Sequence, residues 1–475
     1  MTKENIIEIK NAVEKKVDIL HESNNDHSRY EVNKKNYSKI LIHNVPFIFT
    51  CDESDKLAVK EKHSIIIEKG IIQDVLPKEK IKTKDFDLIY DAGKRGGIVI
   101  TPGLINAHSH PPMYLLRSVM ELDEGEDINE TLAGLPEWEE KMTQNDFTIS
   151  TLGDITEQQK FGITTTLSHY NYFDPVEFSA QLTRQNIING ISVASHCSTK
   201  NNPSLIEELI EKKRNSFSTL AMTVHYLSKA SPEVLKQVKK IVDKHDLLFT
   251  FHMSESQEIV SQTVKKHGCR EIDLLEKFGL LNSNSLMSHA IYLNKKEIEK
   301  IAKNKVGIVH LPTSNTIHKS GTFPFWDYRE AGAFPQMALG TDSVVSKSRL
   351  DILTEAYQTR LTHLYSRTVK FGTLFKMMTI NGAKALHLPD RGKIIPGMKA
   401  DLAFWKIKDR GFIPYDTTNP FSLLGNLITH NGRIVRDLMV NGKFVIKGRR
   451  HQLVDESKLL AVLQEKHMEM RRRKK

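Results

Sequence analysis

The sequence contains few cysteines and no long apolar run. Only three cysteines occur in 475 residues, and Cys51, Cys197 and Cys269 are too far apart to indicate a disulfide framework or a CxxC metal site. No stretch approaches the roughly 20 apolar residues that are needed to span a bilayer. The first residues also lack the apolar core of a signal peptide. We therefore expect reduced structural thiols, no membrane partner and a cytoplasmic protein.

The sequence has little to indicate nucleic-acid binding. The formal net charge is +10, but the five basic residues 471–475 supply half of it. A terminal basic run is usually solvated or frayed, and no aromatic residues are interleaved with this one for stacking on bases. We expect no nucleic-acid partner.

The length and the spacing of apolar segments predict one large barrel with smaller flanking units, because single cores stop growing at roughly 250–300 residues. Short apolar runs broken by turns occur near both ends, with hairpin-turn signals at Lys69-Gly70 and Asn441-Gly442. The expected organisation is a helical or partly disordered extension over residues 1–36, two parts of a β-sandwich over 37–100 and 398–453, a barrel over 101–397, and a basic C-terminal helix or tail over 454–475.

Between these flanks, short apolar strands alternate with helical segments, which is the pattern of βα units in a parallel sheet. The candidate strands are residues 103–107, 162–167, 190–194, 220–224, 247–251, 285–288, 306–309 and 336–340. These eight strands predict an α/β fold, a closed (β/α)8 TIM-type barrel. Its active site is expected at the C-terminal ends of the strands.

Polar residues, mostly histidines, follow the predicted strands. His108 and His110 are two residues apart at the end of the first strand, so their side chains point to the same side and can bind one ion. Two imidazoles are not a complete metal site, which needs three or four ligands. The later strand ends carry His169, His196, His225, His252 with Glu255, His289, His310 and Asp342. One buried histidine is more often structural, but this repeated placement indicates an active site.

The ordered series of motifs resembles the amidohydrolase superfamily, in particular its aminohydrolase and chlorohydrolase branch. That branch includes methylthioadenosine/S-adenosylhomocysteine, guanine and cytosine deaminases and the triazine hydrolases. The resemblance covers about residues 38–450. It is carried by Pro102-Gly-Leu-Ile-Asn-Ala-His-Ser-His110, Glu157 with Gly162-Ile-Thr-Thr165, His252-Met-Ser-Glu255, Ser288-His289, His310-Leu-Pro-Thr-Ser-Asn315, Gly340-Thr-Asp-Ser343, Asn381-Gly-Ala-Lys-Ala-Leu386 and Pro396-Gly-Met-Lys-Ala-Asp401.

The resemblance implies a mononuclear metal site. Similar proteins bind one divalent ion through both histidines of HxH, a histidine on strand five and an aspartate on strand eight. Here these ligands would be His108, His110, His252 and Asp342. Binuclear relatives bridge their metals with a carboxylated lysine, typically from strand four, where this chain has Val224-His225-Tyr226. We expect one divalent metal ion per chain, with Zn²⁺ first and Fe²⁺ as the alternative.

The resemblance also assigns three catalytic residues. Bound zinc lowers the pKa of a coordinated water to about 7. Asp342 would take a proton from that water, Glu255 would protonate a ring nitrogen of the substrate, and His289 would orient the water or stabilise the developing oxyanion. A glutamate in HxxE is typical of the deaminases, whereas some chlorohydrolases replace it. We therefore expect ammonia release from an amino-substituted nitrogen heterocycle, such as a purine, pterin, pyrimidine, triazine or nucleoside.

Three questions stay open at this point. Candidate substrate contacts are Arg117, Trp138, His169, His196, His225, His310, Asn315 and Ser343, and for several of them core packing or a satisfied polar group is the alternative. The seven acidic residues between Glu121 and Glu137 form either a solvated lid or contacts to substrate hydroxyl or cationic groups. Alternatives to deamination are loss of a halide or cleavage of an amide-like C–N bond on a similar ring, and an inactive barrel that acts as a binding protein.

Relatives are often dimers, so by analogy a homodimer is expected.

Overall fold

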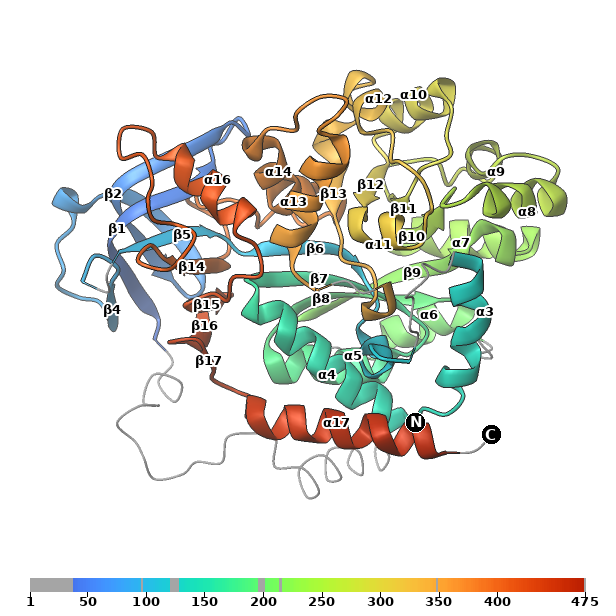
Figure 1. The fold of residues 1–475 in the computed structure, drawn as a ribbon, viewed down its shortest axis with the longest axis horizontal. Coiled ribbons are helices and arrows are strands. Elements are labelled where there is room, and N and C mark those ends of the chain that lie inside the picture. Colours follow the sequence, from blue (N-terminus) through green and yellow to red (C-terminus); the bar gives the residue numbers. More distant parts are fainter. Residues whose placement is uncertain are drawn as a thin grey trace.

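The computed structural model describes residues 37–94, 97–119, 128–194, 201–212, 216–346 and 349–473, without the side chains of 128–132. The predicted N-terminal extension, most of the acidic loop and His196 lie outside these residues. Two sheets organise the described chain: an eight-stranded sheet in the middle and a nine-stranded sheet to one side (Figure 1).

The eight-stranded sheet is the predicted barrel. All seven pairs of neighbouring strands are parallel, and one bridge between Ser109 and Asp342 joins its two ends. In order these strands are β6 (Leu104–Ser109), β7 (Ile163–Tyr170), β8 (Asn186–Ser192), β9 (Ser218–Tyr226), β10 (Leu248–Met253), β11 (Ser285–His289), β12 (Gly307–His310) and β13 (Met337–Leu339). Each predicted strand overlaps one of these, so the (β/α)8 prediction is confirmed.

Helices lie around the barrel strands (Figure 1). They are α3 (Ile128–Glu139), α4 (Gln144–Lys160), α5 (Phe173–Thr183), α6 (Pro203–Glu211), α7 (Pro232–His245), α8 (Gln257–His267), α9 (Glu271–Lys277), α10 (Lys295–Lys303), α11 (Pro312–Ile317), α12 (Phe325–Glu330), α13 (Ile352–His363), α14 (Phe371–Met378) and α15 (Ile380–Ala385). Helix α7 shows how the local sequence starts a helix. The Ser231 side chain caps it by accepting a hydrogen bond from the Val234 N–H, and Pro232 occupies the first turn. Its buried residues Leu235, Val238, Ile241 and Val242 form the stripe that packs on the barrel.

Both flanks of the chain contribute to the nine-stranded sheet. Strand β5 joins them, because it pairs in parallel with β1 and antiparallel with β14. The strands are β1 (Lys39–Cys51), β2 (Leu57–Glu68), β3 (Ile71–Pro77), β4 (Leu88–Asp91), β5 (Ile98–Pro102), β14 (Leu402–Lys406), β15 (Asp437–Val440), β16 (Lys443–Lys447) and β17 (Arg450–His451), with α16 (Phe421–Thr429) in the second flank.

The two predicted hairpin turns of this sheet lie against each other. Lys69, Gly70, Asn441 and Gly442 all have positive φ, as tight hairpin turns require. A Cβ atom on Gly70 would lie 2.6 Å from the carbonyl oxygen of Asn441, so only glycine permits this approach. The turns therefore fix the two flanks to one another.

The C-terminal helix α17 (Glu456–Arg472) packs against α4 and the short 3-10 helix η2 (Pro111–Leu116), which directly follows His110 (Figure 1). Its His467 Nδ1 lies 2.7 Å from the carbonyl oxygen of Leu115 and donates to it. Arg473 pairs with the buried carboxylate of Asp146, so the terminal basic run is anchored at this residue rather than fully solvated. Helix α17 thus supports the segment that follows the predicted ligands His108 and His110.

We predict that Leu463→Ala in α17 lowers the free energy of unfolding by about 2–5 kcal/mol, because it leaves a cavity in the cluster that also contains Leu115 and Leu152. Leu463 is 6% exposed, whereas Leu460 on the same helix is 61% exposed. The matched variant Leu460→Ala is expected to change stability by less than about 0.5 kcal/mol. Chemical denaturation measures both, and equal losses would show that α17 does not pack as described.

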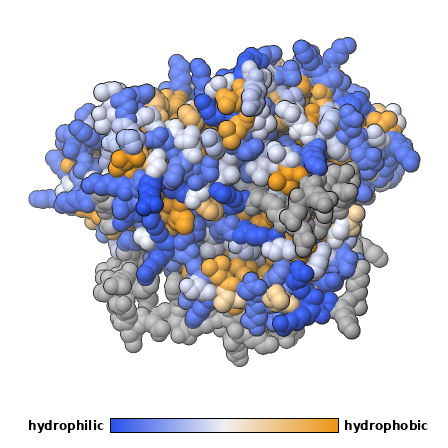
Figure 2. Space-filling model, in the orientation of Figure 1, coloured by the Kyte–Doolittle hydropathy of each residue, from blue (hydrophilic) through white to orange (hydrophobic). Residues whose placement is uncertain are grey.

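The visible face of the molecule is mainly hydrophilic, with apolar residues in small separate patches (Figure 2). Among the described residues, no helix combines the length and the apolar character that are needed to cross a bilayer. Two of the three cysteines, Cys51 and Cys269, are described, and both are free thiols.

Candidate active site

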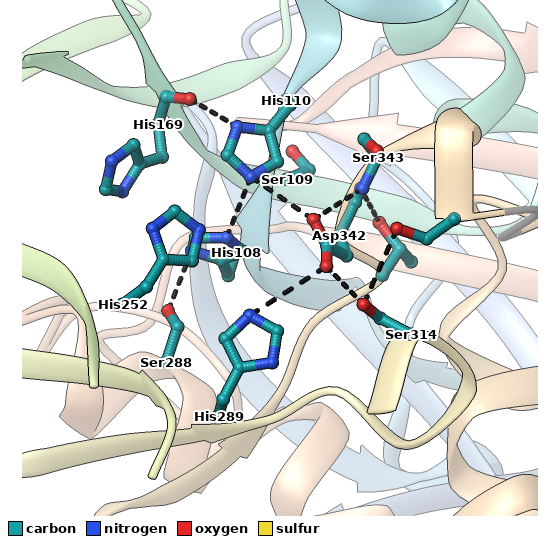
Figure 3. Close-up of polar contacts among 12 residues, drawn as sticks. His108, Ser109, His110, His169, His252, Ser288, His289, Ser314, Asp342 and Ser343 are labelled. Carbon is teal, nitrogen blue, oxygen red and sulfur yellow. Dashed lines mark hydrogen bonds and ion pairs between the residues drawn. The ribbon is translucent and has the colours of Figure 1, made fainter. Parts of the chain in front are cut away.

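Histidine and aspartate side chains meet at the C-terminal ends of the barrel strands (Figure 3). The Nε2 atoms of His108 and His110 are 3.1 Å apart, and His110 Nε2 lies 3.2 Å from Asp342 Oδ1. Ligand atoms of His108, His110 and Asp342 all lie within 4.8 Å of one another, and so do those of His108, His169 and His252. The structure therefore brings together the four predicted ligands, with His169 beside them.

Backbone contacts between the first and last barrel strands hold this cluster. The N–H groups of Thr341 and Asp342 both donate to the carbonyl oxygen of His108, each at 3.1 Å. A Cβ atom on Gly340 would lie 2.8 Å from that oxygen, so the close approach requires glycine. Asn106 adds side-chain hydrogen bonds to Thr341 through both its oxygen and its nitrogen. The motif that contains Asn106 and His108 therefore meets the motif that contains Gly340, Thr341 and Asp342 where the last barrel strand lies beside the first.

The partner of each Nδ1 atom fixes the orientation of the ligand histidines. His110 Nδ1 donates to the carbonyl oxygen of His169 at 2.7 Å, and His252 Nδ1 donates to that of His225 at 2.8 Å. A carbonyl oxygen can only accept, so in the neutral rings Nε2 carries the free lone pair. His108 Nδ1 lies 2.8 Å from Ser288 Oγ, which orients its Nε2 toward His110 in the same way.

Burial and neighbouring side chains keep His108, His252 and Asp342 in the protonation states that bind a cation. The pKa values of His108 and His252 lie well below the ordinary value, first because burial disfavours the charged ring and then because neighbouring histidines repel it. Burial alone would raise the pKa of Asp342, but the hydrogen bond with His110 and the nearby histidines hold it well below its ordinary value. Neutral imidazoles around a carboxylate are the form that a divalent metal requires. The donor set therefore fits a divalent ion.

Two site residues have left-handed backbone conformations that are unusual for residues other than glycine. His289 has φ 66° and Asp342 has φ 61°. Such conformations cost on the order of 1–3 kcal/mol each and are concentrated at functional sites. For Asp342, the Ser343 N–H donates to Oδ1 at 2.8 Å and Ser314 Oγ donates to Oδ2 at 2.6 Å. These bonds hold the carboxylate toward His110.

The predicted proton donor Glu255 lies beside the cluster. It is 1% exposed, and its Oε2 lies 3.5 Å from His289 Nε2. The Tyr226 hydroxyl donates to the same oxygen at 2.6 Å. Burial and the Glu255 carboxylate raise the pKa of Tyr226 well above its ordinary value, so it keeps its proton. Glu255 Oε1 is buried and has no hydrogen-bond partner among the described residues.

Three of the predicted substrate contacts, His225, Asn315 and Ser343, contact these residues directly. The ring of His225 is 4.7 Å from that of His252. Asn315 Oδ1 accepts from His289 Nδ1 at 2.8 Å, and Ser343 contacts Asp342 through its backbone as described above. His310 stacks on Phe323 with ring centroids 4.3 Å apart, and within the described chain neither of its ring nitrogens has a hydrogen-bond partner.

Arg117 and Trp138 lie on the segment after the first strand and already have protein partners. The guanidinium of Arg117 lies 2.8 Å from Glu157 Oε1 and stacks on the ring of Tyr114 at 4.4 Å. Trp138 is half-buried, with Lys141 Nζ 4.4 Å from its ring centroid. These contacts give both residues a structural role, and their contact to substrate stays a prediction.

Three hydroxyl groups of the site have no role that could be predicted from the sequence. These are Ser288 on His108, Ser314 on Asp342 and Tyr226 on Glu255. Ser288 and Ser314 belong to motifs of the family resemblance, and Tyr226 directly follows the predicted contact His225. However, Ser288 and His108 are 180 positions apart, and only the register between strands brings them together.

The barrel with its histidine–aspartate cluster defines a metal-dependent hydrolase that acts on C–N bonds other than peptide bonds. The profile of the amidohydrolase family matches residues 99–445, and the chain belongs to this family.

Two relatives match over most of the chain. A 5-methylthioadenosine/S-adenosylhomocysteine deaminase of Pyrococcus furiosus is 29% identical over 420 residues, which cover 84% of this chain and 94% of the relative. The enzyme of the same name from Thermococcus sibiricus is 30% identical over 409 residues, which cover 81% and 90%.

Solved structures share the fold. An adenosine deaminase of Xanthomonas campestris with bound zinc has a TM-score of 0.78 at 22% identity and covers 91% of this chain and 98% of its own. A zinc complex of atrazine chlorohydrolase from Arthrobacter aurescens has a TM-score of 0.80 at 19% identity and covers 90% and 100%.

Proposed function

We propose that this protein is a zinc-dependent deaminase that releases ammonia from an amino-substituted nitrogen heterocycle, with an adenine-type nucleoside as the first candidate. The observation that carries this proposal is Glu255 Oε1, a buried carboxylate oxygen without a partner among the described residues, next to the histidine–aspartate cluster. An unpartnered buried acceptor is costly, so its retention beside a metal site indicates a group that acts on a ligand. The deaminase names of the relatives that cover most of the chain support the same reaction.

His108, His110, His252 and Asp342 would hold the ion. When bound, the ion would supply a nucleophile by lowering the pKa of a coordinated water from 15.7 to about 7. Zinc is proposed because nitrogen and carboxylate donors suit it, with iron as the alternative. The zinc complexes of two proteins with the same fold support this choice.

The residues of the chain would then handle the protons. Asp342, ionised in the site, accepts a proton from the attacking water and returns it to the amino group, which leaves as ammonia when the C–N bond breaks. Glu255 delivers a proton to the ring nitrogen next to the carbon under attack, which makes that carbon more electrophilic, and Tyr226 holds its second oxygen in place. His289, oriented by Asn315, lies between Glu255 and Asp342 and stabilises the charge that develops on oxygen.

A substrate screen tests the proposal. We expect the purified, zinc-loaded protein to release ammonia from at least one compound among adenine-type nucleosides, other purines, pterins, pyrimidines and aminotriazines. Ammonia is measured with a coupled dehydrogenase assay, and chloride release from chlorotriazines is measured in parallel. Release of chloride without ammonia would assign a different leaving group. Metal-free protein that gains no activity with Zn²⁺ or Fe²⁺, but binds a heterocycle, would indicate the inactive binding protein instead.

A further inference from the structure

We propose that His169 is a fifth ligand of the metal ion, so that His108, His110, His169, His252 and Asp342 together surround it. This inference rests on the proposed metal site and deepens it. The sequence analysis assigned His169 only as a substrate contact.

The first support is the position of His169 in the barrel. It lies on β7, the neighbour of the strand that carries His108, and its own carbonyl oxygen accepts the hydrogen bond from His110 Nδ1 at 2.7 Å. Its side chain is 2% exposed, and its ring centroid lies 4.6 Å from that of His252 and 5.3 Å from that of His108. The ring is therefore fixed among the ligand rings (Figure 3).

The second support is the lack of hydrogen-bond partners for the ring. Neither nitrogen of His169 has one among the described residues. By contrast, His108, His110, His252 and His289 each have a partner at Nδ1. A buried polar group without a partner costs about 1–3 kcal/mol. Coordination of a cation by one nitrogen would offset this cost, and imidazole is a common ligand for zinc and iron.

The third support is that the two groups of ligand atoms share one residue, His108. One group contains His108, His110 and Asp342, and the other contains His108, His169 and His252. His108 belongs to both, but Ser288 engages its Nδ1 and only Nε2 is left for an ion. One lone pair binds one ion, so the shared His108 favours one ion between the two groups over two separate ions.

The test compares His169→Asn with His310→Asn. His310 is a matched control because it is also buried, has no hydrogen-bond partner at either nitrogen among the described residues and belongs to neither ligand group. Each protein is stripped of metal, and its zinc affinity is measured by competition with a chromophoric chelator. Each is also loaded with Co²⁺, whose visible absorption strengthens when the number of ligands around the ion falls.

Substitutions outside the first coordination shell weaken metal binding by about 10–100-fold. Since His169 would be a direct ligand, we expect His169→Asn to weaken zinc binding by at least this factor. The same variant should also strengthen the cobalt absorption. The affinity and spectrum of His310→Asn should match the wild type. Unchanged zinc affinity and cobalt spectrum in His169→Asn, with only a higher KM, would overturn the proposal and leave His169 as a substrate contact. A second variant, His169→Gln, provides the same readout if the first does not fold.

The two proposals fail in distinguishable ways. If wild-type protein binds zinc but releases no ammonia, the proposed deaminase activity fails and the comparison of zinc affinities still decides the role of His169. If wild-type protein binds neither zinc nor cobalt, the metal site itself is wrong, and the fifth ligand is overturned with it.

Discussion

The Glu255→Gln variant is expected to lower kcat by about 10²–10⁴-fold, because glutamine cannot deliver the proton that activates the ring carbon. The substitution keeps the size of the side chain, and its amide oxygen can still accept the hydrogen bond from Tyr226. Zinc content and thermal stability should therefore stay at the wild-type level. The measurement is the rate of ammonia release at saturating substrate, with elemental analysis of the same sample.

A matched control for this variant is Glu258→Gln, since Glu258 is exposed on the first turn of α8, three residues away. It should retain wild-type kcat and KM. Activity of Glu255→Gln within a factor of about two of the wild type would remove Glu255 from proton transfer, whose usual contribution is far larger. Loss of zinc in this variant would instead give Glu255 a role in assembling the metal site.

The barrel and the gathering of histidines at one of its faces were predictable from local patterns, whereas the choice of four ligands among these residues came from the family resemblance. Alternating apolar strands and helices define βα units, and the ends of parallel strands meet at one face. Histidines at the C-terminal ends of the strands, such as His108 and His252, are therefore expected at the same face of the barrel. The spacing of His108 and His110 also fixed their common direction, because side chains two residues apart on a strand share a face.

The contacts that tune the site were not predictable, because they depend on register and packing between distant segments. The carbonyl oxygen of His225 orients His252, and the approach of Gly340 to His108 closes the barrel. Neither pairing leaves a local signal in the sequence. In the same way, the terminal basic run indicated a solvated tail by composition, whereas its Arg473 pairs with Asp146 of α4. Packing between distant segments decides how these side chains are oriented and whether a terminal segment is solvated or anchored.

Removal of the metal ion is expected to abolish activity completely. Without the ion, water near Asp342 keeps a pKa of about 15.7, so hydroxide is not available at neutral pH. Dialysis against a strong chelator should therefore give inactive protein, and addition of Zn²⁺ or Fe²⁺ should restore ammonia release. Because binding stabilises only the folded state, the metal-free protein should also have a lower Tm, which rises with added zinc.

Variants of single histidines connect this loss to the described cluster. His252→Gln should not regain activity at zinc concentrations that fully restore the wild type, because it removes a proposed ligand whose Nδ1 donates to the His225 carbonyl oxygen and whose Nε2 is left for an ion. His245→Gln changes a histidine that contacts Glu207 at the C-terminal end of α7, away from the cluster, and it should respond to zinc like the wild type. Full activity in protein shown by elemental analysis to be metal-free would contradict both expectations. The buried carboxylates of Glu255 and Asp342 would then have to activate water by themselves.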